Sequence, residues 1–144
     1  MSSNKLFIVH AIIMSIAIFI VFPFALVMSI GRVVDDWYTY HKYAMFLTTF
    51  LIFCGVLLAL YTKDLQSEKS LTNTAALHST LGIILLILFI VQLWWAIVMR
   101  RYLHLKNKRK TWLVGHIIFA ILIVVLVIFQ VYFGSKMLKN RVEN

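Results

Sequence analysis

Four histidines stand at or near the start of four long apolar segments in this chain of 144 residues. They are His10, His41, His78 and His116, and a fifth histidine, His104, lies in a basic stretch that we assign to a solvated loop. An ionisable ring inside a membrane is costly and is a functional candidate by default. Imidazole nitrogen binds haem iron, zinc and copper. A single such histidine would more simply join two helices by a hydrogen bond, but four, one per segment, favour ligation.

The segments that carry these histidines are long enough to cross a membrane. Hydrophobic residues make up 62% of the chain and the mean hydropathy is +0.93, whereas soluble domains average about 45–50% apolar residues. About 20 apolar helical residues span a hydrocarbon layer of roughly 30 Å. The sequence therefore predicts an all-α integral membrane protein, a four-helix bundle forming a single domain over residues 1–144. The expected spans are 6–30, 38–61, 76–99 and 111–137.

The first span is interpreted as retained in the protein. At 25 residues it exceeds the apolar core of a signal peptide, which is about 7–15 residues long. Pro23 lies inside this span and predicts a kink, because proline lacks the N–H that the helix needs.

The basic residues favour one orientation in the membrane. The net charge is +9, and eight of the 14 lysines and arginines lie on the side that carries the loops at 31–40 and 100–110. The positive-inside rule predicts that these loops are cytosolic. We attribute the charge to topology and contact with lipid head groups, and we expect no nucleic-acid partner. The single cysteine, Cys54, cannot form a disulfide within the chain.

Alternating span directions sort the four histidines into two layers. His10 and His78 fall near one membrane face, and His41 and His116 near the other. Two imidazoles per layer fit the axial positions of a haem, and such ligation leaves no open iron position, which favours electron transfer over oxygen chemistry. Two imidazoles without thiolate or carboxylate make a poor zinc site. We therefore predict two bis-histidine haems per chain.

Three further residues lie on the same helix faces as the histidines of their spans. Gly55, Gln92 and Gln130 each follow the histidine of their own span by 14 residues, or about 21 Å along a helix, which reaches the opposite layer. Gly55 is expected to let a porphyrin approach the backbone. Gln92 and Gln130 could hydrogen-bond a haem or a ligand ring, although such residues taken alone more often hydrogen-bond one helix to another.

Two basic residues lie beside the His41 layer. Arg32 and Lys42 would suit haem propionates or an anionic reductant such as ascorbate, and they would equally suit lipid contact. For the basic residues 106–110 lipid contact is favoured. Cys54 and the methionines are interpreted as packing residues.

The ordered set of helix motifs resembles the cytochrome b561 family over nearly the whole chain. The four segments that carry the likeness are HAIIMSIAIFIVFPFALVMSIGR, HKYAMFLTTFLIFCG, LHSTLG and TWLVGHIIFAILIVVLVIFQVYFG. The likeness rests on a leading histidine, a mid-helix proline, later glycines, and a tryptophan before the last histidine. Ala76 and Ala120 replace a serine and a glycine of the family pattern, and many members have six helices.

The resemblance implies a transmembrane oxidoreductase with two haem b groups. It assigns His10 and His78 to the non-cytosolic haem, and His41 and His116 to the cytosolic haem. It further implies electron transfer from cytosolic ascorbate to monodehydroascorbate or ferric iron on the other side, often in homodimers. Two alternatives stay open: a haem-bearing membrane-anchor or relay subunit of a larger redox complex, and a non-redox membrane scaffold.

Overall fold

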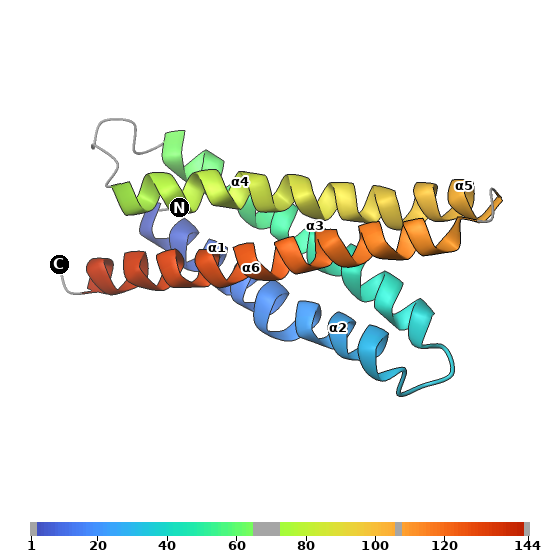
Figure 1. The fold of residues 1–144 in the computed structure, drawn as a ribbon. Coiled ribbons are helices and arrows are strands. Elements are labelled where there is room, and N and C mark those ends of the chain that lie inside the picture. The colour runs from blue at the N-terminus through green and yellow to red at the C-terminus, as the bar shows by residue number, and fades with distance from the viewer. Residues whose placement is uncertain (1–2, 65–72, 106–107, 143–144) are drawn as a thin grey trace. The chain divides into compact units, whose positions relative to one another are not determined.

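The computed structural model describes residues 3–64, 73–105 and 108–142, and these residues are helical apart from short connections (Figure 1). The chain divides into two compact units, Met1–Lys69 and Ser70–Asn144. The first unit holds α1 (Ser3–Ile16), η1 (Ala17–Val21), α2 (Phe22–Gly31) and α3 (Trp37–Asp64). The second holds α4 (Asn73–Trp94), η2 (Trp95–Met99), α5 (Arg100–Leu105) and α6 (Arg109–Val142).

Among the described residues, four helical stretches are long and apolar enough to cross a membrane. They are Lys5–Gly31, Trp37–Tyr61, Thr74–Leu103 and Arg109–Lys139. This confirms the expected all-α class and the four apolar helices, and their ends lie within four residues of the expected ones. The arrangement fits a multi-pass membrane protein. The single domain expected over residues 1–144 stays a prediction.

The first unit is a helical hairpin in which the continuous rod of α1, η1 and α2 packs along α3 (Figure 1). A short turn after Gly31 joins the two arms, and Arg32 enters it with a φ of 46°. Ala17 and Ala25 are fully buried, which lets the arms approach closely. The buried hydroxyl of Thr48 donates to the carbonyl of Ala44 in its own helix, so it needs no partner from the facing arm.

A π-helical turn stands directly before Pro23, where the sequence predicts a kink. Pro23 is the second residue of α2 and has no N–H to donate to the preceding turn. The turn before it widens, and the N–H of Phe22 donates to the carbonyl of Ala17, five residues earlier. Such turns commonly mark helix bends, so the interruption expected at Pro23 is present in this form.

The second unit is also a hairpin, in which α4, η2 and α5 run beside α6 (Figure 1). Two tryptophans join its arms through hydrogen bonds. The indole N–H of Trp95 donates to the carbonyl of Trp112 at 3.0 Å, and that of Trp112 donates to the carbonyl of Trp95 at 3.3 Å. Gly115 provides the space for the Trp95 ring, because a Cβ at this position would overlap the ring and lie 2.6 Å from its Cε2.

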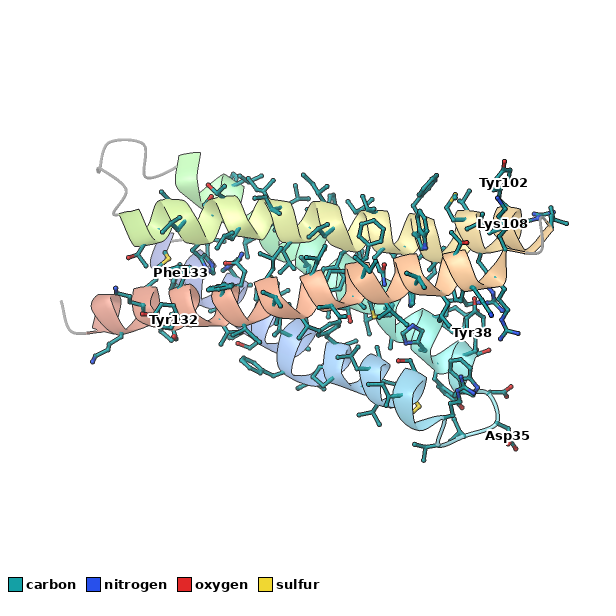
Figure 2. All side chains as sticks on the ribbon, viewed as in Figure 1. Asp35, Tyr38, Tyr102, Lys108, Tyr132 and Phe133 are labelled. Carbon is teal, nitrogen blue, oxygen red and sulfur yellow. The ribbon has the colours of Figure 1, made fainter. Side chains whose placement is uncertain are left out.

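The loop expected at residues 100–110 is shorter than predicted. The chain stays helical through Leu105 in α5, and α6 begins at Arg109. Charged and polar residues end an apolar span without ending a helix, since Arg and Leu are good helix formers and this stretch has no Gly or Pro. In Figure 2, Tyr102 and Lys108 lie at this end of the unit, whereas Tyr132 and Phe133 lie far along α6. In the first unit, Asp35 and Tyr38 lie at the turn that joins its arms (Figure 2).

We predict that Gly115→Ala destabilises the second unit by about 1–3 kcal/mol, because the added methyl must displace a rigid indole that is held by hydrogen bonds. Reversible unfolding in mixed detergent micelles measures the change. The double variant Gly115→Ala/Trp95→Phe is the control and should recover part of the loss, since the smaller ring leaves room. Wild-type stability for Gly115→Ala alone would contradict the packing described here.

Candidate functional site

Both histidines of the first unit bind a main-chain carbonyl on the facing arm. The Nδ1 of His10 lies 2.8 Å from the carbonyl oxygen of Gly55, and the Nδ1 of His41 lies 2.8 Å from that of Ala25. A carbonyl oxygen can only accept, so each Nδ1 carries the proton and donates it. The Nε2 atom of each ring then keeps its lone pair. Both rings are therefore held in the tautomer that a metal ion binds through Nε2.

These two rings occupy different levels of the first hairpin. His10 contacts α3 at Gly55, which is 14 residues after His41, and His41 contacts α2 at Ala25, which is 15 residues after His10. At about 1.5 Å per residue the two contacts are roughly 21–23 Å apart along the hairpin. The prediction that the position 14 residues after a histidine reaches the opposite layer therefore holds for Gly55.

The second unit repeats this two-level pattern with different partners. His116 contacts Gln92, which is 14 residues after His78, and the Gln92 Nε2 lies 3.1 Å from Nδ1 of the ring. His78 lies against Gly134 on α6, where an added Cβ would be 3.1 Å from its Cε1. Gly134 is 18 residues after His116, so the two contacts are roughly 21–27 Å apart along the hairpin.

A tryptophan one turn before His116 fixes the plane of its ring. The rings of Trp112 and His116 are stacked, with centroids 5.3 Å apart and planes 16° from parallel. The guanidinium of Arg100 lies 5.8 Å from the centre of the Trp112 ring, within cation–π range. Sequence reasoning missed the stack, although the i, i+4 spacing of the two aromatic rings on one helix is a signal that could have found it.

Gly55, Gln92 and Gln130 all lie where the arms of a hairpin approach closely. A Cβ at Gly55 would be 2.5 Å from Sδ of Met14, so within the unit this glycine makes room for a methionine. A Cβ at Gly82 would be 2.7 Å from Nε2 of Gln130, so this glutamine packs across its own hairpin. The expected approach of a porphyrin to Gly55 stays a prediction.

Two buried amide oxygens stand out among the described residues. The Oε1 atoms of Gln92 and Gln130 have no hydrogen-bond partner there, although the two side chains are only 3% and 8% exposed. An unsatisfied buried acceptor costs about 1–3 kcal/mol. Each oxygen is therefore available to a donor that a ligand or a change of state would supply.

Arg32 and Lys42 each lie over an aromatic ring near the turn of the first hairpin. The Arg32 guanidinium is 5.1 Å from the centre of the Trp37 ring, and the Lys42 Nζ is 4.7 Å from that of Tyr43. Their assignment to propionates or a reductant stays a prediction. The side chain of His104 and the whole of Lys106 lie outside the described residues.

Within residues 3–64, 73–105 and 108–142, no three His, Cys, Asp or Glu side chains gather in a way that could hold a metal ion. Axial ligation of a haem needs only two protein ligands. Cys54 is a half-buried free thiol.

Residues 1–102 match the family model described as Domain of unknown function (DUF2427). The chain belongs to this family. The part that matches the DUF2427 model contains His10, His41 and His78 and ends within α5, so His116 and Gln130 lie beyond it. No curated protein and no solved structure matches the chain.

The contact of His10 with Gly55 predicts an order of stability for two variants. His10→Asn offers an amide N–H near the former Nδ1 position and should keep the bond to the carbonyl. His10→Leu removes this bond and should lose about 0.5–1.5 kcal/mol more than His10→Asn. Reversible unfolding of haem-free protein in micelles gives the comparison. Equal stability of the two variants would show that this hydrogen bond does not hold the arms together.

Proposed function

We propose that this DUF2427 member is a transmembrane electron-transfer protein with two haem b groups. In this proposal His10 and His78 ligate one haem iron, and His41 and His116 ligate the other. The observation that carries the proposal is the hydrogen bonding of His10 and His41 to main-chain carbonyls, at 2.8 Å each. Metal-bound histidines almost always donate their other ring N–H to a carbonyl, a carboxylate or water.

The residues present fit the axial ligation of haem. In both rings of the first unit the lone pair is on Nε2, and no rearrangement is needed before an iron binds there. The His78 ring packs against Gly134, where an added Cβ would lie 3.1 Å from its Cε1, so the glycine makes room for the ring. In this proposal these features prepare the imidazoles for ligation through Nε2.

The spacing within each hairpin supports two haems instead of one. The histidine contacts are roughly 21–23 Å apart in the first unit and roughly 21–27 Å in the second. A hairpin that spans a membrane therefore carries one imidazole toward each face. We propose that each layer takes one ligand from each hairpin, which accounts for all four histidines of the apolar helices.

When bound, the haems supply a one-electron couple, and the chain supplies its surroundings. The apolar helices exclude water, and the carbonyl acceptors raise the electron-donating strength of the rings, which stabilises the ferric state. The basic turn of the second unit would face the cytosol and attract an anionic donor of the ascorbate type. Monodehydroascorbate or ferric iron would be the acceptor on the other side, as in an ascorbate-dependent or ferric reductase. Homodimers or a larger membrane complex are compatible with this role.

A non-redox scaffold is the second candidate function. The observation that favours it is that His10, His41 and His116 each bond to the facing arm of their own hairpin. In that case the histidines hold paired arms together, and their spacing follows from packing alone.

Single alanine variants of the four histidines separate the two candidates. We predict that His10→Ala and His78→Ala remove the same haem signal from the reduced-minus-oxidised spectrum and leave the other. His41→Ala and His116→Ala should remove the second signal, because a haem iron that loses one of two axial ligands loses its low-spin spectrum.

Each double variant within a pair, such as His10→Ala/His78→Ala, serves as a control and should resemble its single variants. Purified wild-type protein without any haem α-band would favour the scaffold. Loss of the same haem in His10→Ala and His41→Ala would refute the proposed pairing while leaving haem binding intact.

A further inference from the structure

The His116 ring is held differently from the rings of the first unit. Its flat face is stacked on Trp112, and its edge meets the amide of Gln92. The Gln92 Nε2 is 3.0 Å from the His116 carbonyl oxygen and 3.1 Å from its Nδ1. One amide nitrogen, with two hydrogens, thus reaches both the main chain and the ring of the same residue.

This arrangement selects the opposite ring tautomer from that of His10 and His41. Because an amide N–H donates, Nδ1 of His116 must accept in this state, and the ring proton lies on Nε2. A ring protonated at Nε2 has no lone pair there for a metal. In the state described by the structure, His116 is therefore not ready for ligation through Nε2.

The Oε1 atom of the Gln92 amide is the group that could reverse the tautomer of His116. Its Oε1 is buried and has no hydrogen-bond partner among the described residues, in a side chain only 3% exposed. A half-turn of the amide exchanges its nitrogen and oxygen positions. Oε1 would then accept from Nδ1–H of His116, the ring proton would lie on Nδ1, and Nε2 would carry the lone pair. The Trp112 stack holds the ring, so the amide is the group that turns.

We propose that Gln92 is a positioning residue that switches His116 between a ligand-free tautomer and an iron-ligating tautomer by turning its amide. The inference rests on the proposed function, since it gives His116 an iron to bind. The turn exchanges two bonds donated by Nε2 for one accepted by Oε1, so ligation by His116 is less favourable than ligation by a pre-set ring.

The tautomer of His116 without haem is tested on haem-free protein in micelles. Nuclear magnetic resonance of protein labelled with ¹⁵N at histidine distinguishes the tautomers. We expect His116 to carry its proton on Nε2, and His10 and His41 to carry theirs on Nδ1. Gln92→Met has a similar size and no amide, and it should abolish the preference of His116 alone. A wild-type His116 protonated on Nδ1 would overturn the proposal, whatever the haem content.

The ligated half is tested by redox titration of haem-loaded protein. In Gln92→Glu the carboxylate can only accept a hydrogen bond from Nδ1–H of His116. The variant should therefore favour ferric over ferrous iron at one haem by about tenfold, which lowers the midpoint potential of that haem by about 59 mV. It should also slow the loss of that haem to an apomyoglobin trap. Gln92→Met removes the acceptor and should raise the same potential and speed the loss.

The matched control is Thr49→Val, which replaces another buried polar side chain whose hydroxyl bonds only its own helix at Met45. It should leave both potentials and both loss rates unchanged. If two haems are present and both Gln92 variants leave both potentials unchanged, the switch is wrong and the proposed function stands. If no haem binds, both fail together.

Discussion

The hydrogen bond from an imidazole Nδ1–H to a main-chain carbonyl on the facing arm organises the candidate site. In the first unit it fixes the ring orientation and the tautomer together, at 2.8 Å for both His10 and His41. Few alternatives would compete with it in a membrane-spanning hairpin, because a hydrocarbon layer offers the ring no water to bond to. The helical carbonyl already accepts one bond from its own helix and uses its second lone pair for the ring.

Such a bond forms only where two helices approach closely, and small residues permit that approach. Gly55 provides both the acceptor carbonyl and the space for Met14, and Ala25 is a fully buried acceptor for His41. In the second unit, glycines also allow the arms to approach closely. Gly115 makes room for the Trp95 indole, and Gly134 makes room for the His78 ring. Helix packing and the positions of the histidine rings are therefore one constraint in this protein, and a larger side chain at these sites disturbs both.

The apolar helices, and the separation of the two histidine contacts within each hairpin, followed from the sequence because hydrophobicity and helical rise determine them. Gln92 and Gly55 were found by their spacing of 14 residues, and each contacts a histidine across its hairpin. The acceptor role of Ala25 was not predictable, because any residue has a carbonyl and only helix pairing selects one. The helix through Leu105 was also missed, because charge marks the membrane boundary and not the helix end.

The proposed function requires each chain to hold two haems through paired imidazoles. The most direct measurement is the haem b content per chain of the purified protein, read with the electron paramagnetic resonance of its ferric state. The account predicts two haems per chain, both low-spin with two nitrogen axial ligands. A haem-free protein, or a high-spin iron with an open axial position in wild-type protein, would contradict it.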